Sequence, residues 1–247
     1  MSPRISVVVP VKDDAIELEA CLRALARQTR RPHEVIVVDN GSTDASRAVA
    51  ERHGARVIAE PSPGIPAAAG AGYDAAEGEL IARLDADCRP PATWLADLEE
   101  ALRTADAVTG PGLLRGRGLA LSRAYDLAYL LACGLALGHA PLFGSNLGMR
   151  RSAWLAVRRG AHRADPLLHD DLDLSFHLGA RFRVRRHRHL ALSISGRPFD
   201  DAAAFRWRLR RGWRTVLLHW PEHFPPVRAS ARAIQAVRGG RSRRSRS

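Results

Sequence analysis

The sequence predicts an α/β fold in which a mostly parallel β-sheet is flanked by helices. One observation is the run of apolar, mostly β-branched residues at 5–11, which is typical of a strand covered on both faces. The other is alternation, because similar short runs recur before residue 90 and segments with helical spacing separate them. Strands that alternate with helices form βαβ units, and such units build parallel sheets.

The elements of the amino-terminal half, about residues 1–110, follow this alternation in order. The expected strands are residues 5–11, 34–39, 56–59, 80–84 and 107–110. The expected helices are residues 15–27, 45–53, 64–78 and one opened by Pro90 and Pro91. In the first of these helices Glu17 lies early and Arg27 late, as the helix dipole favours.

The second half, about residues 111–220, has a looser pattern. We expect helices at 119–139, 169–178 and 202–218, a turn leading into a strand within 144–150, and a strand at 182–184. The two halves form one domain, residues 1–220, in which the basic helix at 202–218 is a carboxyl-terminal extension. A basic tail follows at 221–247, and we expect residues 238–247, which contain only Arg, Gly and Ser, to be disordered.

The charge of the chain is unevenly distributed. Residues 1–124 hold 15 Lys and Arg against 18 Asp and Glu, whereas residues 125–247 hold 23 against 8. A basic second half indicates an anionic partner, which can be phosphates, an acidic membrane surface or nucleic acid. The three cysteines are far apart and follow no zinc or disulfide spacing, which favours a reduced, cytosolic setting.

The apolar segments of the sequence bear on whether the protein associates with a membrane. The amino terminus lacks the apolar region of a signal peptide, and no stretch reaches 18 consecutive apolar residues. The nearest approach is 127–142, for which we favour a helix buried in the core over a surface that docks on lipid. We expect a cytoplasmic protein that can be peripheral at the inner face of the cell membrane.

Acidic residues cluster where the predicted strands end. Asp39, Asp44, Asp85 and Asp87 all fall at or beyond carboxyl ends of strands, where parallel sheets bind ligands. In an extended segment Asp85 and Asp87 point to the same side and can converge on one cation. Carboxylate oxygens completed by phosphate oxygens are the usual ligands of Mg²⁺ or Mn²⁺ on a nucleotide. The alternative is a polar turn with two solvated acids.

Five short blocks in a fixed order carry a family resemblance. They are Val7 to Pro10, Val37 to Asp44, Leu84 to Asp87, Gly144 to Asn146 and Asp170 to Leu174. Together they resemble the family 2 glycosyltransferases, which are inverting enzymes of the Rossmann-like GT-A fold. The resemblance covers roughly residues 4–185, and it implies sugar transfer from a nucleotide-sugar donor.

The resemblance implies roles on the donor side. The residues that would lie along the nucleotide base and ribose are Pro10, Val11 and Asp14. Asp39 would accept a hydrogen bond from the base, as a carboxylate can from a ring N–H. Asp85 would contact the ribose or the metal, and Asp87 would bind the metal, which would be Mn²⁺ or Mg²⁺.

The resemblance also implies a catalytic pair and an acceptor side. Asp171 occupies the place of the family's general base, and Asp170 stands where the family usually has Glu and could be the base instead. Asn146 would line the acceptor side, although a turn-forming Asn is nearly as good an interpretation. Attack by an activated hydroxyl on the anomeric carbon would then invert its configuration.

The chain departs from the family in one segment. Where the family commonly reads G-x-x-x-A-R-N-x-G, Ala69 replaces the Arg and Gly70 replaces the Asn. The Q-x-x-R-W motif of processive synthases is also absent, so we expect single-sugar transfer. The donor would be linked to UDP or GDP, and a lipid-linked acceptor is one candidate; we do not expect nucleic acid. The alternatives are an inactive relative that binds anionic ligands or membranes through arginines, and a nucleotidyltransferase.

Overall fold

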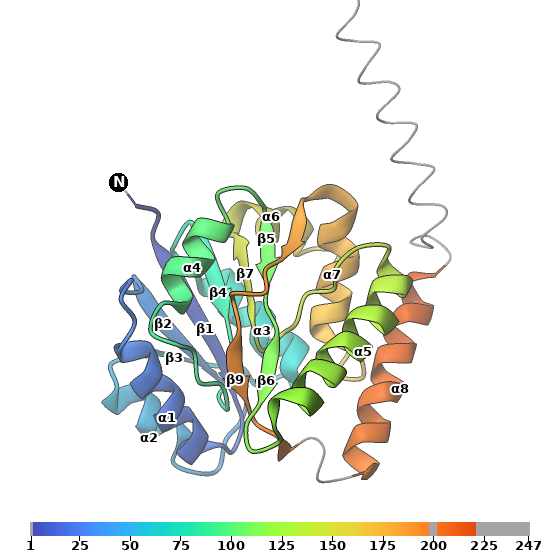
Figure 1. The fold of residues 1–247 in the computed structure, drawn as a ribbon. Coiled ribbons are helices and arrows are strands. Elements are labelled where there is room, and N and C mark those ends of the chain that lie inside the picture. Colours follow the sequence, from blue (N-terminus) through green and yellow to red (C-terminus); the bar gives the residue numbers. More distant parts are fainter. Residues whose placement is uncertain (1, 198–201, 221–247) are drawn as a thin grey trace, which may run out of the picture.

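The fold is a three-layer α/β domain, seen here in a computed structural model that describes residues 2–197 and 202–220 (Figure 1). The central sheet has seven strands in the order β3-β2-β1-β4-β7-β5-β8. These strands are β1 (Ile5–Val11), β2 (Glu34–Asp39), β3 (Arg56–Ala59), β4 (Leu80–Arg83), β5 (Ala107–Thr109), β7 (Leu147–Arg150) and β8 (Val184–Arg186). All neighbours pair in parallel except β7, which runs antiparallel to β4 and β5. The predicted mostly parallel sheet is confirmed.

Helices cover both faces of this sheet. They are α1 (Ala15–Ala26), α2 (Ser46–Arg52), α3 (Ile65–Ala75), α4 (Trp94–Ala101), α5 (Leu119–Leu137), α6 (Arg151–Val157), α7 (Asp170–Arg181) and α8 (Ala202–His219). Every residue of β1 is buried, because its alternate side chains enter two separate cores. Val7 and Val9 pack with α1 and α4, whereas Val8 packs with α3 and α7. This two-sided burial explains why the strand is apolar throughout.

The strand register brings the acidic loops to one edge. Val11 of β1 pairs with Asp39 of β2, and β4 lies on the other side of β1. The carboxyl ends of these three parallel strands therefore meet, and Asp85 follows the end of β4 by two residues. Ligands of open α/β sheets bind at this edge.

Some elements had no signal in the sequence. A second, two-stranded sheet pairs β6 (Gly112–Leu114) with β9 (Leu192–Ile194), and α6 follows β7 directly. These short elements depend on contacts with distant parts of the chain, β6 on β9 and α6 on α3 and α7, rather than on a local period. β8 begins at Val184, slightly later than the expected strand. The predicted tail at 221–247 lies outside the described residues.

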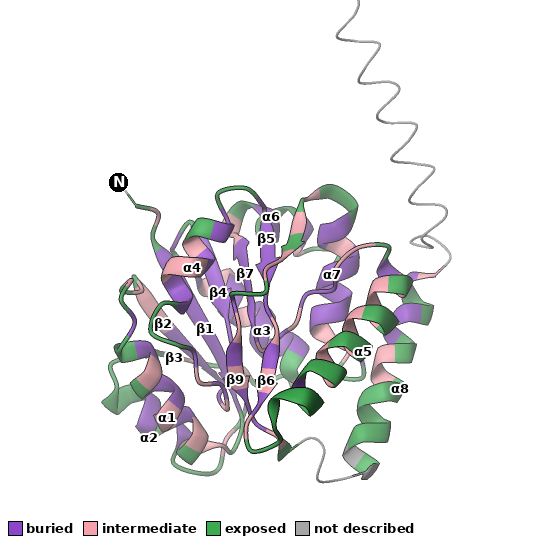
Figure 2. Ribbon diagram, viewed as in Figure 1, coloured by how far each residue is buried: buried purple, intermediate pink, exposed green. Residues whose placement is uncertain are grey.

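The expectation that the long apolar helix is buried is wrong. α5 is exposed over most of its length, as Figure 2 shows, and Leu127, Leu131 and Leu135 are more than half exposed. Among the described residues α5 is the one helix long and apolar enough to cross a membrane by length and composition. Its carboxyl-terminal end packs with α7 and α8 in a small cluster of Leu137, Leu172, Phe176 and Val216. α5 and α8 thus flank α7 and present an apolar outer surface.

Candidate active site

The ends of β1 and β2 form the first wall of the candidate site. Asp39 is 7% exposed, and its Oδ1 accepts a hydrogen bond from the Ser42 N–H at 2.9 Å. Pro10 and Val11 are buried beside it at the end of β1. Asn40 has a structural role, because its Nδ2 donates to Glu60 O and Ser62 O at 2.8 and 2.7 Å. The loop after β2 is therefore held in one conformation around Asp39.

The two acids after β4 lie near each other but have different partners. Asp85 accepts hydrogen bonds from Arg83 Nη2 at 3.0 Å and from Ser145 Oγ at 2.6 Å. Asp87 Oδ2 lies 3.6 Å from Arg197 Nη2, which also contacts Asp14. Asp14 and Asp87 thus share one arginine, and Asp85 is held by another.

The carboxyl group of Asp87 has a raised pKa. Burial, and next the negative charge of Asp85, raise the pKa of Asp87 to about 6, although Arg197 opposes this. Such a group is stabilised by a nearby positive ion. Its oxygen ligand chemistry, together with that of Asp85, fits Mg²⁺ or Mn²⁺. The expected metal pair of Asp85 and Asp87 is therefore chemically suited to that role.

Arg83 is a site residue that the sequence interpretation missed. It lies on β4, it is 1% exposed, and its guanidinium pairs with Asp85 and also with Asp170 at the start of α7. These carboxylates hold the pKa of Arg83 well above its ordinary value despite burial, so it stays charged. The sequence contained a signal for Arg83. It is a charged residue within an apolar strand, and at two positions before Asp85 it is expected on the same side of the strand as that acid.

The start of α7 holds the expected catalytic pair. Asp171 is 4% exposed, and both its oxygens accept hydrogen bonds: Oδ1 from His169 Nδ1 at 2.6 Å and Oδ2 from Gly144 N at 2.8 Å. Tyr129 of α5 also donates to Oδ2, at 3.4 Å. Burial raises the pKa of Asp171, but the charge of His169 and the hydrogen bonds from His169 and Gly144 outweigh burial. The pKa of Asp171 is therefore held well below its usual range.

Asp170 differs from its neighbour. Burial is the main influence and raises the pKa of Asp170, and the charge of Asp171 acts in the same direction, although Arg83 opposes both. Its carboxylate also lines a small cavity beside α3, whereas Asp171 does not. Asp170 is consequently the more basic and the more accessible of the two carboxylates.

The structure does not support Asn146 as an acceptor-side residue. Asn146 is 1% exposed; its Oδ1 accepts from Trp94 Nε1 at 2.9 Å, and its Nδ2 donates to Leu190 O at 2.5 Å. These bonds join β7 to α4 and to the segment before β9. The backbone N–H of Asn146 also donates to Phe143 O at 2.8 Å across the turn at 144–145, so the structure favours the alternative interpretation, a turn-forming Asn.

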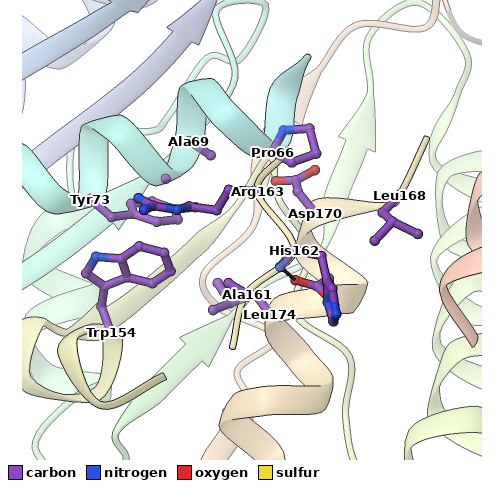
Figure 3. A pocket seen from close by; sticks show the side chains of 12 residues that line it. Pro66, Ala69, Tyr73, Trp154, Ala161, His162, Arg163, Leu168, Asp170 and Leu174 are labelled. Atoms are coloured by element: carbon purple, nitrogen blue, oxygen red, sulfur yellow. Dashed lines mark hydrogen bonds and ion pairs between the residues drawn. The ribbon is translucent and has the colours of Figure 1, made fainter. Parts of the chain in front are cut away.

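The departure at Ala69 and Gly70 has a structural counterpart. A Cβ at Gly70 would lie 2.3 Å from Cδ of Arg163, so the arginine occupies the space that a side chain there would need. Arg163 lies against α3 beside Tyr73 and Trp154 (Figure 3), and it pairs with Asp74. It lines the same cavity, of about 20 Å³, as Asp170. An arginine thus reaches this region from another part of the chain.

Comparison with known proteins agrees with the fold. A model of glycosyl transferase family 2 matches residues 6–152, which is more than half of the chain. The protein belongs to glycosyl transferase family 2, and its fold is the GT-A fold of that family.

Two curated relatives and one solved structure show how far the similarity extends. An uncharacterized glycosyltransferase of Mycobacterium bovis is 41% identical over 107 residues, 43% of this chain and 47% of its own. An undecaprenyl-phosphate 4-deoxy-4-formamido-L-arabinose transferase of Pseudomonas paraeruginosa is 35% identical over 116 residues, 43% of this chain and 34% of its own. The chain thus spans less than half the length of these relatives.

The solved structure is the mannosyltransferase PcManGT of Pyrobaculum calidifontis, determined with GDP-Man and Mn²⁺. It superposes with a TM-score of 0.66 at 20% sequence identity, covering 94% of this chain and 69% of its own. At this identity the similarity concerns the fold.

Proposed function

We propose that the protein transfers a single sugar from a nucleotide-sugar donor to an acceptor, with inversion at the anomeric carbon and with help from a divalent metal. The observation that carries the proposal is the Arg83 guanidinium, which pairs with both Asp85 and Asp170. It joins the acidic segment after β4 to the start of α7. A group suited to the donor diphosphate and a group suited to proton removal thus lie at one edge of the sheet.

The donor would occupy the carboxyl ends of β1, β2 and β4. Pro10, Val11 and Asp14 would line the base and ribose, and Asp39 would accept a hydrogen bond from the base. Membership of the family and the structure determined with GDP-Man support a nucleotide sugar linked to GDP or UDP. Arg197 lies beside Asp14 and Asp87 and adds positive charge for a diphosphate.

Asp87, with Asp85, would hold Mn²⁺ or Mg²⁺. When bound there, such an ion acts as a Lewis acid that stabilises the diphosphate leaving group. The raised pKa of Asp87, caused first by burial and then by Asp85, supports this assignment. Arg83 holds Asp85 in place, so that the two carboxylates keep their relative position.

Asp170 is the better candidate for the general base. A base must accept a proton at neutral pH and must reach the acceptor. Both acids have partners, but Asp170, which pairs with Arg83, has the raised pKa and lines the cavity. Asp171 accepts hydrogen bonds at both oxygens, from His169 and from Gly144 N–H, so it would orient the start of α7 and stabilise a charged His169. A single in-line displacement needs one proton acceptor and a stabilised leaving group, and these side chains supply both.

A lipid-linked acceptor at an anionic membrane surface fits the acceptor side. Tyr129 contacts Asp171, while the outer side of the same helix exposes Leu127, Leu131 and Leu135. α8 adds exposed Trp207 and Trp213 among arginines, and a groove of about 880 Å³ runs along it. Aromatic and aliphatic side chains flanked by arginines are typical of interfacial helices. The name of the Pseudomonas relative includes a polyprenyl phosphate. Such a molecule joins an apolar chain to an anionic phosphate, which suits apolar side chains flanked by arginines.

A donor screen tests the reaction. The full chain is incubated with UDP- and GDP-linked sugars with and without Mn²⁺, and nucleotide release and transfer to polyprenyl phosphate are followed by mass spectrometry. We expect metal-dependent turnover of one donor class. Salt-sensitive binding of nucleotides without any turnover would instead support the inactive, arginine-rich binder.

Vesicle flotation tests whether the exposed apolar surface of α5 and α8 binds an anionic membrane. We expect the full chain to float with vesicles containing phosphatidylglycerol and to remain behind with pure phosphatidylcholine. Leu131→Glu should reduce flotation several-fold because it places a charge on the apolar side of α5. Ile16→Glu is a matched control, since Ile16 is 86% exposed on α1, away from that surface. An equal loss in both variants, or flotation independent of lipid charge, would refute a specific surface.

A further inference from the structure

A second group of metal-type side chains lies further along α7. Asp173 and His177 are one helical turn apart on α7, His219 ends α8, and His162 lies in the segment between α6 and α7. His162 Nδ1 lies 2.7 Å from Asp173 Oδ1, His219 Nε2 lies 2.8 Å from it, and His177 Nε2 lies 3.6 Å from it. Three imidazoles from three parts of the chain therefore converge on one carboxylate oxygen. We call this group the His-Asp cluster.

The spacing of the cluster is that of ligands around one ion. The centroids of the three imidazole rings are 5.0, 5.4 and 5.6 Å apart. Imidazoles bound at about 2.05 Å to a tetrahedral ion would have nitrogens roughly 3.3 Å apart and ring centroids roughly 5.2 Å apart. The ligand atoms of the cluster all lie within 4.8 Å of one another. The observed ring spacings therefore match those expected for imidazoles on one ion.

The surroundings hold these groups in place. Asp173 and His219 are each 4% exposed, whereas the His162 side chain is 40% exposed, so one ligand faces solvent and leaves a route for an ion. Phe176 stacks on the His219 ring at 4.3 Å between centroids. The His162 N–H donates to Asp173 Oδ2 at 3.0 Å, which keeps Oδ1 directed at the imidazoles. Supporting contacts of this kind are typical of metal sites.

We propose that His162, Asp173, His177 and His219 bind one zinc ion in a closed, tetrahedral site. Three imidazole nitrogens and one carboxylate oxygen favour Zn²⁺ over Mg²⁺ or Mn²⁺, which prefer oxygen ligands. The site is separate from Asp85 and Asp87 in both residues and chemistry. Because its ligands come from α7, α8 and the segment before α7, the ion fastens α8 and that segment to the helix that begins with Asp170 and Asp171.

Metal analysis of the full chain tests the proposal. The protein is purified without a polyhistidine tag, stripped with chelator, and titrated with Zn²⁺ alone and with Co²⁺ alone. We expect one Zn²⁺ per chain, visible Co²⁺ absorption typical of tetrahedral coordination, and a thermal midpoint about 5–10 °C higher with zinc in excess than in chelator. A folded chain with no stoichiometric zinc, no such Co²⁺ spectrum and equal midpoints in zinc and chelator would overturn the proposal.

Three variants locate the ion. His162→Ala removes the most exposed ligand, so the chain should stay folded, and zinc binding should weaken at least tenfold. It is preferred to His219→Ala, which removes a buried ligand and can prevent folding. His33→Ala, which removes an exposed imidazole elsewhere, should bind zinc as the unmodified chain does. Asp87→Ala should also retain zinc. Loss of zinc in Asp87→Ala, or equal losses in His33→Ala and His162→Ala, would overturn the assignment.

Discussion

The chain contains the same three-residue pattern twice, and the two copies do different things. Asp85-Ala86-Asp87 follows strand β4, whereas Asp171-Leu172-Asp173 lies in the first turn of α7. In an extended segment residues two apart share a side, but on a helix they are separated by about 200°. The expectation of an extended Asp85-Ala86-Asp87 segment is wrong, because Ala86 and Asp87 lie in a turn that the hydrogen bond from Cys88 N to Asp85 O, at 3.0 Å, closes. The two carboxylates are still near enough that the charge of Asp85 contributes to the raised pKa of Asp87. Asp171 and Asp173 diverge, one toward Gly144 and Tyr129 and the other toward the His-Asp cluster.

The electrostatics of the two copies differ as well. Burial and the neighbouring carboxylate raise the pKa of Asp87 to about 6. For Asp173, hydrogen bonds from His177, His219 and His162 outweigh burial and hold its pKa well below the usual range. In this chain the two acids of the turn after β4 interact with each other, whereas the two acids on α7 contact different groups.

The largest effect is expected from Asp87→Ala. It removes a proposed metal ligand, and metal stabilisation of a leaving group is worth several kcal/mol. We expect kcat/KM to fall by about 10³-fold or more, since each 1.36 kcal/mol is tenfold in rate. Steady-state kinetics with the donor identified by the screen measures it. Glu100→Gln is the control, because Glu100 is exposed on α4; retained activity in Asp87→Ala would reject the metal assignment.

The second largest effect separates the acids at the start of α7. Asp170→Asn should lower kcat by about 10²- to 10⁴-fold, the usual contribution of a general base. Binding of the nucleotide, measured by calorimetry, should change little. Asp171→Asn should lower the pKa of His169 because it removes the adjacent negative charge. A larger kcat loss in Asp171→Asn, with the His169 titration unchanged, would make Asp171 the base instead.

Arg83→Met is expected to affect stability rather than the chemical step. The substitution leaves Asp85 and Asp170 without their buried cation, and breaking a buried pair on one side costs about 3–5 kcal/mol. Denaturant unfolding measures the change. Arg103→Met is the matched control, because Arg103 and its partner Glu100 are both exposed and such pairs contribute about 0–1 kcal/mol. Equal stability of the two variants would show that Arg83 does not bridge the two segments.

Much of the fold was predictable because it depends on long, local patterns. The apolar run at 5–11 and the alternation of strands and helices after it predicted the parallel sheet. The acids at the strand ends predicted the edge of the sheet where the candidate site lies. The antiparallel pairing of β7, the short strands β6 and β9, and the helix α6 were not predictable, since pairing and short elements are decided by tertiary contacts.

The candidate site was predicted in its acids but not in their partners, although Arg83 had a signal in its position two residues before Asp85. Arg83, Arg163 and His162 reach the site or its surroundings from positions that no motif marks. Asn146 was assigned to the acceptor side because its residue type allows it, but the burial of its amide depends on Trp94 and Leu190, far away in the sequence. The exposure of α5 likewise depends on what packs against it, which hydrophobicity alone does not tell.

The smallest predicted effect is a pH dependence that only the first D-x-D copy should show. The pKa of Asp87 is raised to about 6, so Asp87 is ionised above that pH and becomes protonated as the pH falls through it. Asp171, with a lowered pKa, stays ionised throughout. Because a ligand must lose its proton to bind a metal, Mn²⁺-dependent donor binding should be constant between about pH 7 and 8 and should weaken by about tenfold for each pH unit below 6.

Calorimetry with a nucleotide sugar measures this dependence without interference, because its diester phosphates do not titrate in the range. Asp87→Asn is the informative comparison: it should bind the donor weakly at every pH and should lose the inflection near pH 6. A profile that is flat down to pH 5 in the unmodified chain would mean that Asp87 is ionised throughout. Asp87 would then not differ from Asp171, and the electrostatic contrast between the two copies would be lost.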